Sequence, residues 1–143
     1  MTNAPSRANW LWLVEAALAE DIGPGDATSE ALLSREDTGV ARLEARAPIA
    51  VCGLAIAREV FALRGVTCEL RVEDGASVAR GAELARVHGP SIGILEAERT
   101  ALNFVQRLSG IATLTRTFRE RVAGTRAEIV DTRKTTPGWR ALE

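Results

Sequence analysis

The feature that most constrains the fold is a change of hydrophobic period at Pro90. Between residues 40 and 87, apart from a stretch of helical spacing at 54–63, apolar and polar residues follow one another in short runs that glycine and proline interrupt, which is typical of short strands. After Pro90, apolar residues recur at helical spacing, which predicts a long amphipathic helix. This helical face is defined by Ile94, Ala97, Ala101, Phe104, Val105 and Leu108. The pattern therefore predicts a β-rich unit up to about Gly93, followed by a helical connector.

Before Pro90 the chain is predicted to contain short elements. The expected elements are a helix at 8–19, a helical turn to residue 33 capped by Asp26 and Thr28 or Ser29, strands at 40–47 and 49–52 with a kink at Pro48, a helix at 54–63, a strand at 67–72, a hairpin-type turn at 74–75, and short strands near 78 and at 84–87. Short strands with frequent glycines favour a compact sandwich over an open sheet.

The segment after Pro90 is predicted to contain two helices and a strand. Ser109-Gly110 is expected to interrupt the long helix, and a second helix ends at Gly124. Residues 127–131 then form the first strand after the helices, so one strand of a further unit is expected.

Composition excludes several classes of function. The net charge is -1 and charges of both signs are interleaved, so no basic face for nucleic acid is expected. Cys52 and Cys68 are isolated, and no signal peptide or membrane span is present, which indicates a cytoplasmic protein. His88 is the only histidine, so a histidine-based metal site or a Ser-His-Asp arrangement has little to build on.

Lys134 is the only lysine in a chain with 17 arginines. It follows Thr132 and Arg133 at the carboxyl end of the predicted strand at 127–131, a position where ligands gather in α/β sheets and barrels. Arg133 could grip a carboxylate through two hydrogen bonds, and Lys134 would add a flexible point charge. The alternative is that Arg133-Lys134 is a solvated basic turn.

Arg99 is the second candidate for a binding residue. On a helical wheel it lies nearly opposite the apolar face of its helix, so it cannot serve that helix's own core contact. The alternative is an exposed arginine paired with Glu96 or Glu98. If Arg99 binds a substrate, that site lies outside its own packing, for example on another subunit.

A third constellation consists of Asp21, Gly23, Gly25, Asp26 and Thr28. Two carboxylates near glycines could hold a metal ion. Helix termination and capping explain the same residues more simply, and we favour that interpretation.

Two long blocks resemble the quinolinate phosphoribosyltransferase family. They run from Glu98 to Thr113 (ERTALNFVQRLSGIAT) and from Asp131 to Gly138 (DTRKTTPG), and a shorter match is EDIGPGDAT at 20–28. The resemblance implies an α+β chain with an N-terminal open sandwich that contains a barrel-sandwich-hybrid element. The first helices and strand of an incomplete α/β barrel would follow, with the domains at 1–106 and 107–143.

The resemblance also implies an activity. Enzymes of this family are pentosyltransferases of NAD biosynthesis that convert quinolinate and phosphoribosyl pyrophosphate, with Mg²⁺, to nicotinate mononucleotide, pyrophosphate and carbon dioxide. By motif position, Thr132, Arg133 and Lys134 would bind quinolinate, and Arg99 would enter the pocket from the partner subunit of a homodimer. No residue of this chain is assigned as a catalytic acid or base, or as a metal ligand.

Family members are roughly twice as long, so we expect this chain to be a fragment that is inactive alone, with apolar surface left uncovered on its connector helices. The alternatives are the related pyrophosphorylase-like protein associated with molybdenum transport and a non-catalytic dimerisation module. A swinging-arm carrier is improbable because the lone lysine lies far from the turns near residues 75 and 81.

Overall fold

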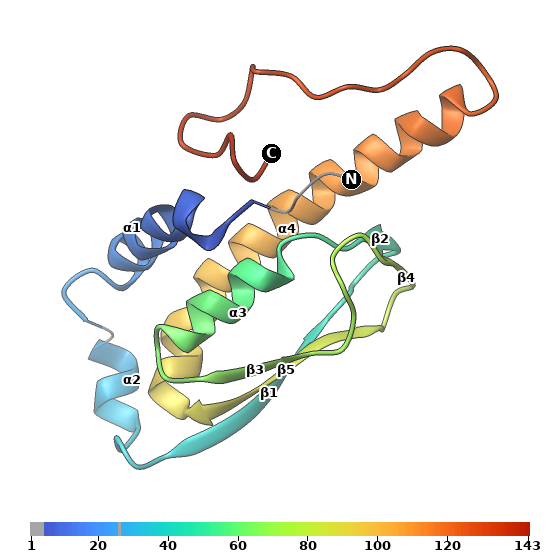
Figure 1. The fold of residues 1–143 in the computed structure, drawn as a ribbon. Helices are drawn as coiled ribbons and strands as arrows, with labels where there is room; N and C mark the ends of the chain where they lie inside the picture. The colour runs from blue at the N-terminus through green and yellow to red at the C-terminus, as the bar shows by residue number, and fades with distance from the viewer. Residues whose placement is uncertain (1–4, 26) are drawn as a thin grey trace.

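A small antiparallel sheet carries two helices on one face, and a third helix crosses them (Figure 1). The computed structural model describes residues 5–25 and 27–143. The elements are η1 (Arg7–Asn9), α1 (Leu11–Ile22), α2 (Ala27–Leu32), β1 (Thr38–Glu44), β2 (Ile49–Ala50), α3 (Leu54–Ala62), β3 (Thr67–Leu70), β4 (Ser77–Val78), β5 (Glu83–Pro90) and α4 (Ser91–Val122).

The strands form two small antiparallel groups. One sheet has the order β1-β5-β3, so β5 pairs with a neighbour on each side, and the second group is the pair β2-β4. Asp74-Gly75 forms a turn as expected, but β3 and β4 on either side of it belong to different groups. The structure is therefore a mixed α/β fold with small sheets.

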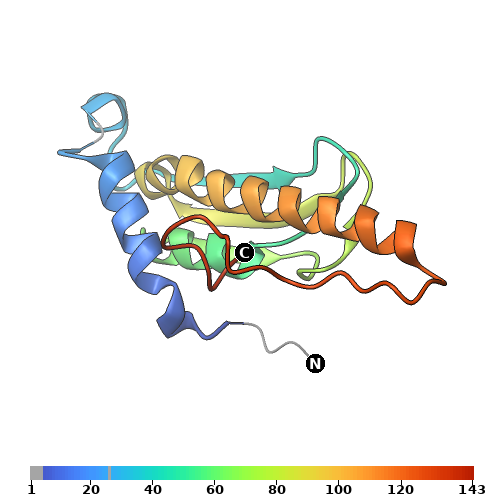
Figure 2. The same ribbon diagram turned by 90° about the horizontal axis from the view of Figure 1, so that it is seen from above.

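The core lies between the sheet and the helices α3 and α4. Helix α3 packs along α4, and α1 contacts both of them (Figure 2). Apolar side chains on one stripe of each helix meet the inward residues of the sheet, which is how amphipathic elements remove apolar area from water. The largest of the fully buried side chains are Phe104, Leu54, Leu84, Val14, Val51 and Val60.

Helix α4 is continuous, so the predicted interruption at Ser109-Gly110 is wrong. The Ser109 hydroxyl accepts a hydrogen bond from the N–H of Cys52 (3.0 Å) and donates one to the carbonyl of the same residue (3.1 Å). One turn later, the Thr113 hydroxyl accepts a hydrogen bond from the N–H of Ala50 (2.9 Å). Ser109 therefore joins α4 to the segment after β2, and this tertiary contact outweighs its weak helix propensity.

The strand predicted at 127–131 is also wrong for this chain, because these residues have no strand conformation. A strand needs a neighbour to satisfy its N–H and C=O groups, and no strand of the described residues pairs with this segment. The side chains of Ile129 and Val130 are exposed there.

The other predicted elements are present with shifted ends. The first helix begins with the short turn η1 and continues to Ile22, while the strand predicted at 67–72 ends at Leu70. Asp26, a predicted cap of α2, lies outside the described residues. Among the helices of the described ranges, none is long and apolar enough to cross a membrane.

Candidate functional site: exposed cations on helix α4 and in the segment that follows it

Arg99 projects from the outer face of α4, as predicted, and its side chain is 74% exposed. Its Nε lies 3.0 Å from Oδ1 of Asp21, near the end of α1. The alternative, an exposed arginine paired with Glu96 or Glu98, is right about the exposure but not about the partner: no ion pair of the described residues joins Arg99 to either glutamate, and Glu96 accepts a hydrogen bond from Nε of Arg64 (2.8 Å). Only the arginine end of this pair is open to solvent, since the Asp21 side chain is 21% exposed, so the Arg99 guanidinium stays accessible to a second anion.

The residues around Asp21 serve to end helix α1. Gly23 has a φ of +56° and its N–H bonds the carbonyl of Ala19, which closes the last turn. Over the residues that the structure describes, no group of three or more His, Cys, Asp or Glu side chains could hold a metal ion. Asp26 and the side chain of Thr28 lie outside the described residues. The interpretation that this group of residues ends a helix therefore rests on Asp21 and Gly23.

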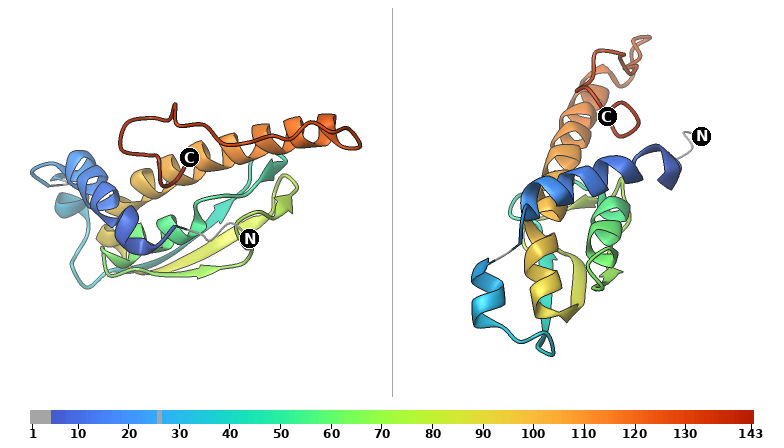
Figure 3. Two further views of the ribbon diagram at one scale, coloured as in Figure 1. Left: turned by 45° about the horizontal axis from the view of Figure 1, so that its top comes forward. Right: turned by 90° about the vertical axis from the view of Figure 1, so that its left-hand side faces the viewer.

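Thr132, Arg133 and Lys134, called here the cation segment, lie in an exposed stretch that returns along α4 (Figure 3). The N–H of Lys134 donates a hydrogen bond to the Thr132 hydroxyl (3.2 Å), which turns the backbone locally. The guanidinium of Arg140 donates a hydrogen bond to the carbonyl of Arg133 (3.0 Å).

In the described part of the chain, no carboxylate forms an ion pair with Arg133 or Lys134. Two adjacent cations without an internal counter-ion can attract an anionic ligand. Thr132, Arg133 and Lys134 lie together because they are consecutive in the chain, whereas no hydrogen bond or ion pair among the described residues joins Arg99 to them. The placement of Arg99 in another subunit's site stays a prediction.

Residues 135–143, called here the C-terminal segment, fold back onto α4. The Trp139 ring stacks on that of Phe104, with centroids 4.9 Å apart, and Arg107 lies over the same Trp139 ring at 5.3 Å. Sequence reasoning missed these contacts. The only signal for them was Trp139 itself, a large apolar residue in a segment without helical or strand period.

Glu143 is the polar centre of this contact. Its carboxylate accepts hydrogen bonds from the N–H of Thr136 (2.9 Å), from the hydroxyl of Thr136 (2.9 Å) and from Nε of Arg107 (2.9 Å). These donors hold the pKa of Glu143 below its ordinary value, the Thr136 N–H being the largest cause. Glu143 is therefore ionised at neutral pH.

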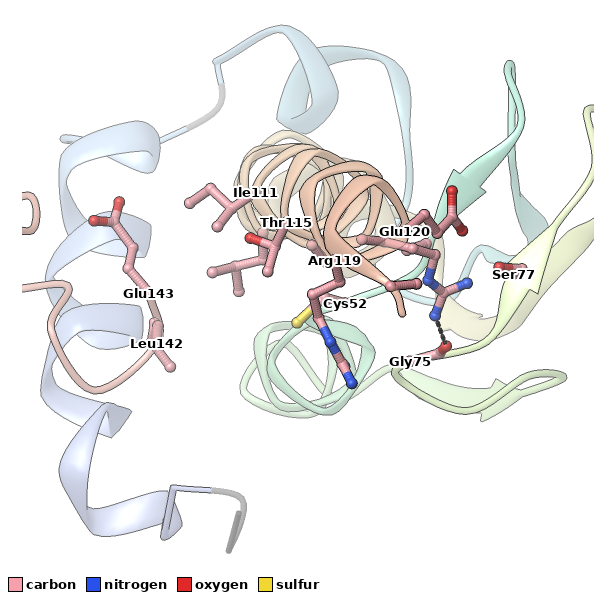
Figure 4. A pocket seen from close by; sticks show the side chains of 14 residues that line it. Cys52, Gly75, Ser77, Ile111, Thr115, Arg119, Glu120, Leu142 and Glu143 are labelled. Carbon is pink, nitrogen blue, oxygen red and sulfur yellow. Dashed lines mark hydrogen bonds between the residues drawn. The ribbon is translucent and has the colours of Figure 1, made fainter. Parts of the chain in front are cut away.

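A hollow of about 700 Å³ lies between α4, the β2-β4 pair and the C-terminal segment (Figure 4). It contains none of the predicted site residues. Cys52 lines it, but burial raises the pKa of this thiol, so it is not a thiolate nucleophile at neutral pH. Arg116, which also lines the hollow, donates a hydrogen bond to the carbonyl of Gly75 (2.6 Å).

His88 is a surface residue, as expected. Its Nε2 lies 3.6 Å from a carboxylate oxygen of Glu69, and both side chains are about half exposed. Among the residues that the structure describes, no ion pair or hydrogen bond joins it to Arg99 or to the cation segment.

Comparison with known proteins identifies the family. The model of the quinolinate phosphoribosyl transferase N-terminal domain matches residues 26–109, and the model of the C-terminal domain matches residues 111–143. The chain is 42% identical over 126 residues to a probable nicotinate-nucleotide pyrophosphorylase (carboxylating) of Bacillus subtilis, covering 87% of this chain and 43% of the relative. A nicotinate-nucleotide pyrophosphorylase (carboxylating) of Mycobacterium leprae is 41% identical over 135 residues, covering 91% and 48%.

A solved structure shows the same architecture. The crystal structure of NadC from Streptococcus pyogenes superposes with a TM-score of 0.91 at 31% identity, over 96% of this chain and 50% of that one. This chain thus spans about half the length of the relatives it matches. It belongs to the quinolinate phosphoribosyl transferase family.

Proposed function

We propose that this chain supplies the N-terminal half, and part of the substrate site, of a quinolinate phosphoribosyltransferase. The whole enzyme would be a pentosyltransferase that converts quinolinate and phosphoribosyl pyrophosphate to nicotinate mononucleotide, pyrophosphate and carbon dioxide. The observation that carries the proposal is the match of the N-terminal family model to residues 26–109, continued by the C-terminal model. Relatives from Nicotiana tabacum carry the name quinolinate phosphoribosyltransferase (decarboxylating).

The substrate's charge fits the cation segment. Quinolinate is a dianion, and Arg133 and Lys134 have no carboxylate partner among the ion pairs of the described residues. At an effective dielectric near 20, each close charge pair contributes about 4 kcal/mol before desolvation is subtracted. In this proposal Arg133 and Lys134 bind the two carboxylates, and the Thr132 hydroxyl adds a hydrogen bond.

Arg99 completes the pocket from the second subunit of a homodimer. Its outward direction on α4 and the 74% exposure of its side chain support this role, because both leave the guanidinium accessible to another chain. The symmetric arrangement would give each of the two pockets one Arg99 from the neighbouring copy.

The chemical contribution of these residues is binding and orientation. Displacement at the anomeric carbon passes through an oxocarbenium-like state, in which fixed charges and correct positioning lower the barrier. None of the residues named here needs to act as an acid, a base or a nucleophile. Mg²⁺ is expected for the whole enzyme, but no group of the described residues fits such an ion, so no step is assigned to it here.

The finer description of the fold is part of the same proposal. Residues 1–106 would form the open sandwich with its barrel-sandwich-hybrid element, and residues 107–143 would begin the α/β barrel. The two small sheets and the helices packed on them support the first part. We also place the enzyme in the cytoplasm, where its free cysteines would stay reduced.

Calorimetric titration with quinolinate tests the proposal, on the chain completed to the length of its relatives. Wild-type protein is expected to bind quinolinate, and Arg133→Met or Lys134→Met is expected to weaken binding by about tenfold or more, since tenfold corresponds to 1.4 kcal/mol. Arg126→Met removes a nearby exposed arginine and is the matched control, with unchanged affinity.

Two results would contradict the proposal. One is wild-type protein that does not bind quinolinate. That result would favour the alternative, the pyrophosphorylase-like protein associated with molybdenum transport, over the quinolinate enzyme that the comparisons support. The other is equal loss of affinity in all three variants, which would indicate a diffuse charge effect without a site.

A further inference from the structure

Arg107 has no part in the proposed pocket, yet its side chain joins α4 to the C-terminal segment. Its Nε donates a hydrogen bond to Glu143 (2.9 Å), and its Nη2 donates hydrogen bonds to Glu143 and to the Thr136 hydroxyl. The guanidinium also lies over the ring of Trp139. The planar guanidinium of Arg107 thus contacts three residues of the C-terminal segment, which are Thr136, Trp139 and Glu143.

Packing fixes the same segment against two helices. Trp139 stacks on Phe104, which is itself buried in the core, so the ring has a rigid support. Gly138 has a φ of +84°, and a Cβ atom at this position would lie 3.2 Å from the ring of Trp12 on α1. The C-terminal segment therefore lies against both α1 and α4 (Figure 2).

The C-terminal segment is joined to the cation segment by a hydrogen bond as well as by the continuous backbone. The side chain of Arg140 donates a hydrogen bond to the carbonyl of Arg133. On the other side, residues 127–131 pair with no strand of the described chain, and the N–H of Ala127 donates a hydrogen bond to the nearby hydroxyl of Thr125. The position of the cation segment is thus set mainly from its C-terminal side.

We propose that Arg107 is a positioning residue that holds the cation segment at a fixed place relative to α4, through its contacts with Thr136, Trp139 and Glu143. It does not contact the substrate. The effect on substrate affinity rests on the proposed function, because the ordered segment carries the cations assigned to quinolinate. Quinolinate would bind to a cation segment that is already in place. A mobile cation segment would have to lose conformational entropy on binding, which weakens the affinity.

The first arm of the test measures order in this 143-residue chain without any ligand. In Arg107→Met, ¹⁵N relaxation at the backbone amides of Arg133 and Lys134 is expected to show order parameters falling from about 0.85 to below about 0.6. Amides in the first half of α4 report whether the variant is folded. Arg116→Met is the control, because Arg116 lies on the same helix but bonds the carbonyl of Gly75.

A second variant keeps the test decisive if Arg107→Met fails to fold. Glu143→Gln removes the charge that Arg107 contacts and leaves α4 unaltered, so it should also raise mobility at Lys134. Arg107→Lys retains the charge but lacks the planar guanidinium with its several N–H donors. Its order parameters at Arg133 and Lys134 are expected to lie between those of wild type and Arg107→Met. Unchanged order at Arg133 and Lys134 in folded Arg107→Met or Glu143→Gln would overturn the proposal.

The second arm measures quinolinate affinity by calorimetry on the completed chain. Arg107→Met is expected to weaken binding by about tenfold, because small displacements of binding groups have large effects, while Arg116→Met binds as wild type does. Wild-type affinity in Arg107→Met would overturn the role in binding. If wild-type protein itself does not bind, the proposed function fails instead, and the relaxation data still decide whether Arg107 holds the segment.

Discussion

Glu143 gives the contact between α4 and the C-terminal segment a defined dependence on pH. Its pKa is lowered, first by the Thr136 N–H and then by Arg107, so the folded state favours the ionised carboxylate. The resulting stabilisation is fully present above the ordinary glutamate value of 4.5 and is lost as pH falls through the lower pKa of the folded state.

The comparison of wild type with Glu143→Gln checks this directly. Thermal unfolding should show wild type as the more stable protein at pH 7, with the difference in Tm shrinking as pH falls below about 4.5. A difference in Tm that is independent of pH between 7 and 3 would mean that the charge of Glu143 is not what stabilises the segment.

The exposure of Arg99 could be predicted from its place on the helical wheel, but its partner could not. Asp21 lies on another helix, and nothing in the local sequence brings it to α4. The same limit explains why Arg107 was missed: its partners Thr136 and Glu143 are separated from it by a loop whose return path is set by packing on Trp139. Local patterns indicate where a side chain points, and tertiary packing decides what it meets.

At the scale of the element, two glycines of α4 have opposite roles. A Cβ atom at Gly93 would overlap the carbonyl oxygen of Arg64 after α3, whereas a Cβ at Gly110 would meet nothing within 4 Å. Gly93→Ala is therefore expected to destabilise the protein by about 1–3 kcal/mol through overpacking. Gly110→Ala should stabilise the helix by about 0.5–1 kcal/mol.

Denaturant unfolding of the two alanine variants measures both effects, and each serves as the control for the other because the chemical change is the same. Loss of stability in Gly110→Ala would contradict a continuous α4 and would favour the interruption that the sequence suggested. A neutral Gly93→Ala would mean that α4 and the turn after α3 are not in such close contact at Gly93.

Most elements could be predicted from hydrophobic period and glycine placement, including α3, the strands around Pro48 and the start of α4. The two errors at this scale have tertiary causes. The sequence Ser109-Gly110 predicted a break in the helix, but the Ser109 hydroxyl forms hydrogen bonds with the backbone N–H and carbonyl of Cys52. Residues 127–131 have strand composition, but a strand cannot form without a neighbour.

At the scale of the whole molecule, apolar side chains on the second half of α4 are uncovered, as expected from the sequence. Leu114 is 59% exposed and Phe118 is 50% exposed. Together with Ile129 and Val130, they form apolar surface on the part of the chain that the C-terminal family model begins to match. Such surface is typical of a face that packs against further protein.

The central claim is that one quinolinate pocket takes Arg99 from one copy and the cation segment from another. Co-expression of Arg99→Met and Lys134→Met chains, each completed to the length of its relatives, tests it most directly by turnover of quinolinate. Each variant alone is expected to be nearly inactive. Random pairing makes half of the dimers hybrid, and each hybrid contains one intact pocket, so about a quarter of wild-type activity should return. Activity no higher than that of the separate variants would contradict a pocket shared between two copies.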